Sequence, residues 1–287
     1  SSDLIQECFD NTGAPPVSTK WVDTNKGDDE SPDIRSRWVG REFKGNDTNR
    51  DDLFAATPPL EAKRSLFALA SCQKGVEKSK IKKLGFIDIR KAYFHAKAKR
   101  LIYVKLPEEF CEPGEFGKVC GRLNYSLYGT RDAANNWEEC YSQALIDIGF
   151  RQGSASPCVF FHEARQISTV VHGDDFTLLG HKEHLDWFKE KIMERFEIKH
   201  RGRLGPCDDD QKSIRILNRI VTWESTGIVY EADQRHAEII IRLLGFNEKT
   251  KAVNTPGDDE CSKVVDGDLT ELDKEASSKY RAIVARA

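Results

Sequence analysis

The 287-residue chain lacks several features that would assign it to a particular class of protein. No apolar run approaches the ~18 residues that a membrane-spanning helix needs, so the sequence predicts no membrane span. The eight cysteines include no Cys-x-x-Cys pair, which favours reduced intracellular thiols over disulfides or a metal knuckle. There is no internal repeat, no low-complexity tract, no initiator methionine and no signal peptide. We therefore expect a fragment, or a segment cut from a longer polyprotein.

Net basic charge, the usual mark of a protein that binds nucleic acid, is also missing. The formal net charge is −3, with 32% charged residues. The positive charge is concentrated, however: Lys74 to Lys105 contains 11 Lys and Arg against two acids, and Lys199 to Arg203 adds a second basic run. A run such as Lys78 to Lys83 is explained equally well as a solvated face. Acidic loops elsewhere, such as Asp208 to Asp210, lower the total charge without excluding a basic cleft.

An acidic pair between two apolar runs is the most informative feature that is present. Asp174 and Asp175 lie at the tip of a predicted β-hairpin, between Val170-Val171 and the run Phe176 to Leu179. Adjacent acids in a tight turn repel each other, and a bound cation is the usual reason for placing them there. Four other Asp-Asp pairs lie in Gly-, Pro- or charge-rich loops and are explained as solvated turns.

A third acid, Asp88, ends a short predicted strand and is followed by a turn and a helix. An acid at the end of one strand and a pair at a neighbouring hairpin tip can converge on one point. Two divalent ions about 3.5–4 Å apart, held by such carboxylates, catalyse in-line displacement at phosphorus. Mg²⁺ needs only one or two protein carboxylates when substrate phosphates supply other ligands. Asp88, Asp174 and Asp175 are therefore the predicted catalytic and metal-binding residues for two Mg²⁺ ions, with Mn²⁺ as an alternative.

At these residues the chain resembles the reverse transcriptases of Ty1/copia-type retrotransposons. Asp88-Ile-Arg-Lys-Ala-Tyr-Phe94 is similar to their Asp-x-x-x-Ala-Tyr/Phe-Phe/Leu motif, and Val171-His-Gly-Asp-Asp175 to their Tyr-x-Asp-Asp box. Further segments resemble the family in the same order: Lys20 to Val22 with Arg35 to Phe43, Ala56 to Pro59, Tyr103 to Phe110, Leu127 to Trp137, and Ser156 to Phe160. The resemblance implies an RNA-directed DNA polymerase domain of a Pol polyprotein.

The resemblance also implies a dNTP-binding site. Arg37 and Lys26 are candidate triphosphate clamps, because guanidinium and ammonium groups neutralise phosphate charge. Tyr93 is the candidate steric gate that excludes a ribose 2′-OH, with a core aromatic as the alternative. Tyr128 and Gly129 would form the floor beside the templating pair, or are merely a turn into the next helix.

Three positions depart from the family pattern. His172 stands where the family usually has Tyr, Gly173 where it has Val or Met, and Asp132 where it has Gln. None of these is a predicted metal ligand, so the departures bear on rate and fidelity rather than on the reaction class. Lys199 matches a lysine that the family places before Leu-Gly, and it could donate a proton to the leaving pyrophosphate. A solvent-exposed lysine is the alternative.

The hydrophobic periodicity predicts an α+β fold. Strands are predicted at 84–89, 101–106, 158–162, 167–172 and 176–180, with a hairpin at 214–231 that closes on 225–227. Helices are predicted after Thr57, with Thr57 as the cap and Pro58 in the first position, and then from Ala133, over 182–196 and over 236–244. By resemblance this is the palm and fingers of a right-hand polymerase, with an antiparallel palm sheet and a partial thumb. The implied parts are a frayed segment 1–15, fingers 16–80, a palm 81–222 with a fingers insertion at about 108–152, and a partial thumb or connection start 223–287, with RNase H absent.

The implied partners are an RNA or DNA template with its primer, dNTPs and, in the full polyprotein, RNase H and integrase domains. The implied location is a cytoplasmic virus-like particle or the nucleus, with no membrane. Two alternatives remain open. One is a catalytically decayed retrotransposon relic that at most binds nucleic acid. The other is a metal-dependent hydrolase that uses His172, Asp174 and Asp175 with His181 and His184 close behind, because His and Asp together suit Zn²⁺ or Mn²⁺.

Overall fold

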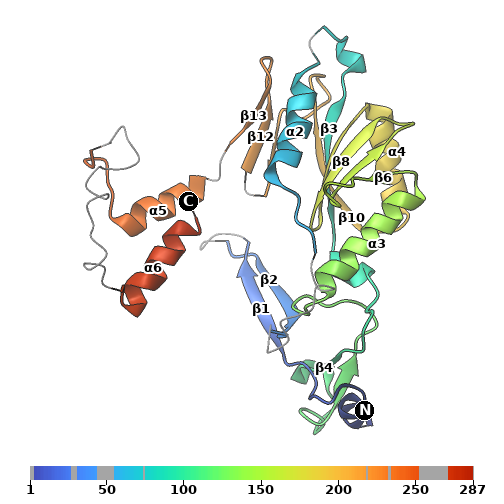
Figure 1. The fold of residues 1–287 in the computed structure, drawn as a ribbon, viewed down its shortest axis with the longest axis vertical. Coiled ribbons are helices and arrows are strands. Elements are labelled where there is room, and N and C mark those ends of the chain that lie inside the picture. Colours follow the sequence, from blue (N-terminus) through green and yellow to red (C-terminus); the bar gives the residue numbers. More distant parts are fainter. Residues whose placement is uncertain are drawn as a thin grey trace. The chain divides into compact units, whose positions relative to one another are not determined.

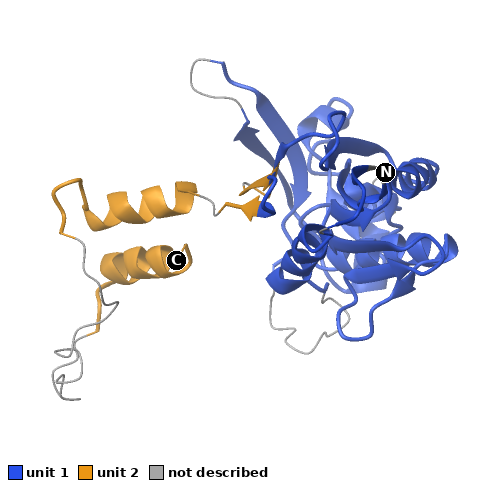
Figure 2. Cartoon of the chain, turned by 90° about the horizontal axis from the view of Figure 1, so that it is seen from above, with its two compact units in different colours: residues 1–214, 223–228 blue, residues 215–222, 229–287 orange. Residues whose placement is uncertain are grey.

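The computed structural model describes residues 3–26, 31–43, 55–73, 75–217, 219–231, 234–251 and 271–286. These residues fall into two compact units (Figure 2). The first unit comprises residues 1–214 and 223–228, and the second comprises 215–222 and 229–287. The first unit contains every candidate site residue.

A six-stranded antiparallel sheet is the central element of the first unit (Figure 1). Its order is β10-β3-β9-β8-β7-β6. The strands are β3 (Lys83–Ile89), β6 (Arg151–Gln152), β7 (Val159–His162), β8 (Ile167–His172), β9 (Asp175–Gly180) and β10 (Ile198–Leu204). The antiparallel sheet and the predicted strands within 84–89, 158–162, 167–172 and 176–180 are confirmed.

Helices cover both faces of this sheet, which explains why β3 is buried at six of its seven positions. On one face, side chains of β3, β8 and β9 pack against α3 (Ala133–Asp147) and α4 (Lys182–Met193) in a single core that includes Ile87, Phe176, Trp137 and Phe188. Helix α2 (Leu60–Ser71) packs against β3, β8 and β9 but is absent from that core. Successive side chains of a strand point to opposite faces, so Asp88 and Asp175 belong to the face that α2 covers.

Two hairpins complete the first unit. One joins β1 (Thr19–Asn25) to β2 (Ile34–Gly40), and the other pairs β4 (Tyr103–Lys105) with β5 (Cys120–Arg122). Three short 3₁₀ helices, η2 (Lys78–Lys80), η3 (Ala92–His95) and η4 (Glu108–Phe110), link the larger elements.

The expectation of a frayed segment 1–15 is wrong for residues 3–12, which form helix α1 (Asp3–Thr12). The helix is held by packing: Cys8 is buried against Tyr103 and Cys120, and Leu4 and Ile5 pack on the same cluster. These side chains follow three- and four-residue spacing, so they lie on one helical face. Tertiary contact with β4 and β5 stabilises a helix whose sequence is mostly polar.

The predicted start of helix α2 is also wrong, because Pro59 rather than Thr57 occupies the N-cap position and no side chain caps the helix. A residue that precedes proline is driven out of the helical region by the proline ring. Pro58 precedes Pro59, so the helix begins only after the second proline, at Leu60.

Residues 213–230 form three strands where the sequence predicted one hairpin. They are β11 (Ser213–Ile216), β12 (Arg219–Trp223) and β13 (Ile228–Tyr230), in that order in one sheet. The predicted turn at 225–227 connects β12 to β13. In the second unit, α5 (Gln234–Leu244) confirms the helix predicted at 236–244 and contacts α6 (Lys274–Val284). Among the described residues no helix is both long and apolar enough to cross a membrane.

Candidate active site

The turn between β8 and β9 carries the acidic pair. His172 and Asp175 are paired across the two strands, so Gly173 and Asp174 form a two-residue hairpin loop. Gly173 has a φ of +62°, and Asp174 is not among the described residues with positive φ. Positive φ at the first loop residue is the pattern of a type II′ turn, which glycine adopts without strain.

Two hydrogen bonds fix this turn from opposite sides. The indole Nε1 of Trp137 donates to the carbonyl oxygen of Gly173 at 2.9 Å. The backbone N–H of Ile89 donates to the carbonyl oxygen of Asp174 at 2.8 Å. The turn is therefore attached to both helix α3 and the end of strand β3.

The third acid, Asp88, lies directly across from Asp175 in the pairing of β3 with β9. Directly opposed residues point to the same face of an antiparallel pair, so both carboxylates lie at one end of the α2 face, next to the Asp174 turn. Burial, together with the negative charges of Asp174 and Asp88, raises the pKa of Asp175 to about 6. Burial also raises the pKa of Asp174, and the Asp88 charge adds to that effect. The structure thus brings together the three acids that the sequence predicted.

Three mutually repelling carboxylates fit the hard-cation site expected from the sequence, since Mg²⁺ and Mn²⁺ prefer oxygen ligands. Only one group of described residues has three possible ligand atoms within 4.8 Å of one another, and it is Cys207, Asp209 and Asp210. The predicted catalytic acids are therefore more widely spaced.

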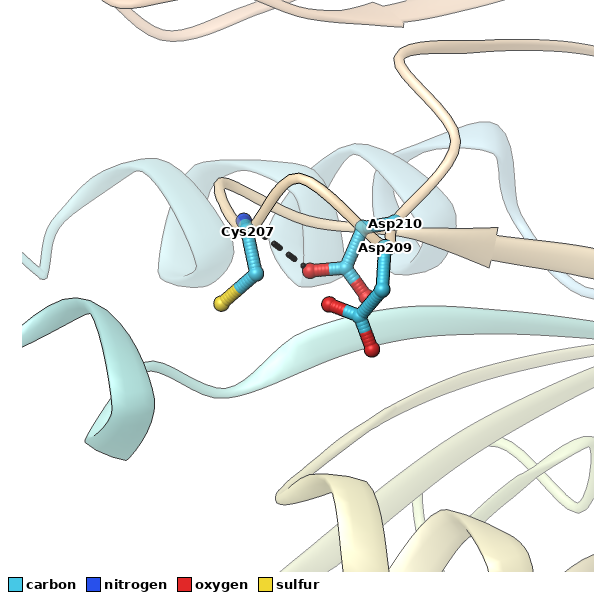
Figure 3. A group of neighbouring side chains, drawn as sticks. All are labelled: Cys207, Asp209 and Asp210. Carbon is cyan, nitrogen blue, oxygen red and sulfur yellow. Dashed lines mark hydrogen bonds between the residues drawn. The ribbon is translucent and has the colours of Figure 1, made fainter.

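The Cys207, Asp209 and Asp210 group, drawn in Figure 3, is explained by an internal ion pair of Asp210. The buried Asp210 carboxylate accepts hydrogen bonds from Arg203 and from the backbone N–H of Cys207, and it lies 2.6 Å from the Lys83 ammonium. Burial alone would raise the pKa of Asp210, but its bond to Lys83 and the other donors hold it below the ordinary value. This carboxylate is already neutralised and stabilises the β3–β10 edge.

A basic residue of β10 contacts the candidate site without having been predicted there. Arg201 forms an ion pair with Asp88, and Lys199 is paired directly opposite Asp88 in the sheet. The basic run from 199 to 203 is evident in the sequence, but its identity as an edge strand is not. Lys199 is exposed and lies opposite Asp88.

Two aromatic rings lie next to the acids. The centroids of Tyr93 and Tyr128 are 4.4 Å apart. Burial raises the pKa of each phenol, and in both cases the charge of Asp174 raises it further, which places both rings near that carboxylate. Tyr93 also packs on the edge of the main core, so the core alternative for this residue is compatible with the same position.

The β1–β2 hairpin meets this aromatic pair through the backbone of Gly129. Gly129 has a φ of +86°, and an added Cβ would lie 2.1 Å from the carbonyl oxygen of Gly40 at the end of β2. Gly40 N–H donates to Tyr128 O at 2.8 Å, and Glu42 N–H donates to Gly129 O at 3.2 Å. Only glycine allows this approach.

Three cations of the β1–β2 hairpin and its flanks differ in how near they lie to the acids. The charge of Arg37 lowers the pKa of Tyr128, and Arg35 acts in the same direction on Asp174, so both guanidinium groups lie within electrostatic reach of the site. Lys26 lies beyond the end of β1, where its backbone N–H donates to Asp33. That is the end of the hairpin where Arg35 pairs with Thr24, and among the described residues no ion pair joins Lys26 to the acids. Arg35 was missed as a candidate, although it is two residues from Arg37 and shares its face.

Asp132, which replaces a Gln of the family pattern, belongs to a partly buried ion cluster. Arg100 donates to both carboxylate oxygens of Glu42, at 2.8 and 2.5 Å, and to Asp132 at 2.9 Å. Asp132 also accepts from Asn136 at 3.0 Å. Through Arg100, the Asp132 carboxylate therefore connects the start of α3 to Glu42, which follows β2.

The hydrolase alternative finds no support in the geometry. His181 and His184 lie past Gly180, at the end of β9 opposite to Asp175. His184 Nδ1 is engaged with the carbonyl oxygen of Arg165 at 2.7 Å. His172 alone lies beside the acids, where burial lowers its pKa.

Comparison with known proteins identifies the family. The profile of the family described as reverse transcriptase (RNA-dependent DNA polymerase) matches residues 8–206. The chain is 27% identical over 256 residues to the retrovirus-related Pol polyprotein from transposon TNT 1-94 of Nicotiana tabacum, which covers 85% of this chain and 18% of that protein. It is 23% identical over 197 residues to the transposon Ty1-DR4 Gag-Pol polyprotein of Saccharomyces cerevisiae. This match covers 66% of this chain and 11% of that protein.

A solved telomerase from Candida albicans, in complex with a TWJ fragment of telomeric RNA, aligns with a TM-score of 0.40 and 10% identity over 85% of this chain and 54% of that chain. This similarity is too low to support an argument. The chain spans less than a fifth of the curated relatives. Because the family profile covers more than half of the sequence, and the relatives are Pol polyproteins of Ty1/copia-type transposons, the chain belongs to the reverse transcriptase family as a domain of the Ty1/copia type.

Proposed function

We propose that this domain synthesises DNA from dNTPs on an RNA or DNA template by two-metal nucleotidyl transfer. The observation that carries the proposal is the pairing of Asp88 with Asp175 across β3 and β9, with Asp174 in the adjoining turn. Two acids on neighbouring strands and one in the turn between β8 and β9 provide oxygen ligands at a single end of the sheet.

In the proposed reaction the primer 3′-OH attacks the α-phosphate of the dNTP, and pyrophosphate leaves. Divalent ions held by Asp88, Asp174 and Asp175 would lower the pKa of the hydroxyl and neutralise the triphosphate. Arg37, with Arg35 beside it, supplies positive charge to the phosphates from β2. Lys199, opposite Asp88, donates the proton that the leaving pyrophosphate requires.

Tyr93 is proposed as the steric gate, because its ring lies near Asp174 and against Tyr128. A ring beneath the deoxyribose leaves no space for a 2′-OH. Tyr128 and Gly129 form the floor of the same site, fixed to β2 by the Gly40 contact. Lys26, just beyond the end of β1, remains a candidate phosphate contact.

The polymerase subdomains are proposals of the same kind. Residues 16–80 would form fingers, residues 81–222 the palm, with a fingers insertion at about 108–152, and residues 223–287 the start of a thumb or connection. The six-stranded antiparallel sheet that carries the acids supports the palm assignment. The proposed partners are a template–primer duplex and the other domains of a Pol polyprotein, and the proposed location is a virus-like particle or the nucleus.

Primer extension on poly(rA)/oligo(dT) with Mg²⁺ or Mn²⁺ tests the proposal, with Asp174→Asn beside the parent and Asp209→Asn as the control. Asp209 is an exposed acid in a loop, so its variant should match the parent. We expect Asp174→Asn to lose extension while it still binds the duplex. Synthesis retained by Asp174→Asn would remove the metal-ligand assignment. Binding by the parent without any extension would identify the decayed relic instead.

A further inference from the structure

A lysine interrupts the buried stripe of helix α2. The four buried residues of this helix are Lys63, Leu66, Phe67 and Ala70, which follow the three- and four-residue spacing of one helical face. Three of them are apolar, as expected of a face that packs on a sheet. Lys63 is only 3% exposed, which is rare for a lysine because its charge is costly to desolvate.

This stripe faces the part of the sheet that carries the candidate acids. Helix α2 packs against β3, β8 and β9. By the alternation of side chains along these strands, Asp88, Asp175 and His172 belong to the face that α2 covers. Lys63 is the first buried residue of the stripe, and its ammonium is within electrostatic reach of Asp175 and His172.

The Lys63 ammonium has no hydrogen-bond acceptor or ion-pair partner among the described residues. It also lies in the first turn of α2, where the helix dipole disfavours a positive charge. Burial lowers the pKa of Lys63, and the negative charge of Asp175 is the effect that opposes this lowering. An unpaired buried cation is retained where opposite charge compensates it, and here that charge comes from the acids.

We propose that Lys63 is a counter-charge beside the metal site that weakens cation binding by the three acids. The inference rests on the proposed metal site. A positive charge held in a poorly solvated position repels a divalent ion bound nearby, and burial leaves little water to screen it. The acids therefore bind divalent ions less tightly than the same three carboxylates would without Lys63. Weaker binding allows the ions to arrive with the dNTP triphosphate and to leave with pyrophosphate.

Titration of the full chain with Mn²⁺, with free ion measured by electron paramagnetic resonance, tests this directly and without catalysis. We expect Lys63→Met to lower the Kd for Mn²⁺ by about tenfold, because a neutral side chain of similar length removes the repulsion. Lys63→Gln should do the same, and it provides a second neutral variant if Met disturbs folding. Lys63→Arg, which keeps the charge, should retain the parent Kd. Arg64→Met removes an exposed charge one residue along the same helix and should leave the Kd unchanged.

The outcomes separate this inference from the proposed function. If the parent binds Mn²⁺, Asp175→Asn abolishes that binding and both neutral Lys63 variants keep the parent Kd, the counter-charge role is refuted while the metal site stands. The counter-charge role is refuted in the same way if Lys63→Met only lowers the free energy of unfolding. If Asp175→Asn leaves Mn²⁺ binding intact, the metal site itself is refuted, and the role of Lys63 with it.

Discussion

Breaking the buried ion pair between Lys83 and Asp210 should lower the stability of the first unit more than breaking a surface ion pair. The Asp210 side chain is fully buried, the Lys83 side chain is 3% exposed, and their charged atoms are 2.6 Å apart. Loss of one partner of a buried pair leaves an uncompensated charge and costs about 3–5 kcal/mol. Asparagine keeps the shape of Asp210 and can still accept from Cys207 N–H, so Asp210→Asn should lower the free energy of unfolding by about 3 kcal/mol.

Urea unfolding followed by circular dichroism measures this change as a shift in midpoint at constant slope. Asp209→Asn is the matched control, since that neighbouring acid is exposed and its loss should change stability by less than about 0.5 kcal/mol. The double variant Lys83→Met/Asp210→Leu should recover most of the loss, because an apolar pair can replace a buried ion pair. A loss below about 1 kcal/mol in Asp210→Asn would refute the view that Lys83 depends on this carboxylate.

Three further predictions concern acid stability, two glycines and sugar selection. The pKa of Asp210 is held below its ordinary value of 3.8, so its stabilising effect is present above that pH and is lost on acidification; the stability gap between the parent and Asp210→Asn should therefore narrow as the pH falls below about 4, and a constant gap would contradict this. Gly129→Ala should lower the free energy of unfolding by more than about 2 kcal/mol, because the added Cβ meets Gly40 O. Gly173→Ala should lower it by only about 1 kcal/mol, because the Cβ has open space and only the positive φ is strained. Equal losses of the two variants in urea unfolding would contradict the role of the Gly40 contact. Tyr93→Val should raise ribonucleotide incorporation in primer extension, and unchanged sugar discrimination would return Tyr93 to the core.

The three acids could be predicted from the sequence because local patterns identify them. Apolar runs on both sides of Asp174 and Asp175 specify a hairpin, and the end of a short strand specifies Asp88. Arg201 could not be predicted as a neighbour of Asp88, because that contact depends on β10 joining the sheet at its β3 edge. The one local pattern in the sequence is that Lys199, Arg201 and Arg203 alternate with other residues, as the side chains on one face of a strand do.

Lys63 illustrates a different limit. Its spacing with Leu66, Phe67 and Ala70 is visible in the sequence, but a lysine at the edge of an apolar stripe is normally solvated. Only the packing of α2 over the acid face shows that this one is buried. The capping error at Thr57, by contrast, was avoidable, because two consecutive prolines exclude a helix start at the first of them.

The hydrogen bond from Trp137 to Gly173 gives the protein an intrinsic fluorescent reporter at the turn of its candidate active site. The indole is 1% exposed and its N–H is bound to the carbonyl that precedes Asp174. Any shift of that turn changes the polarity and hydrogen bonding of this fluorophore, and with them its emission. The other four tryptophans belong to different elements, at positions 21, 38, 187 and 223, and can be replaced by phenylalanine to isolate the signal. Ligand binding that moves this turn can therefore be followed by the intrinsic fluorescence of Trp137, with no label attached to the chain.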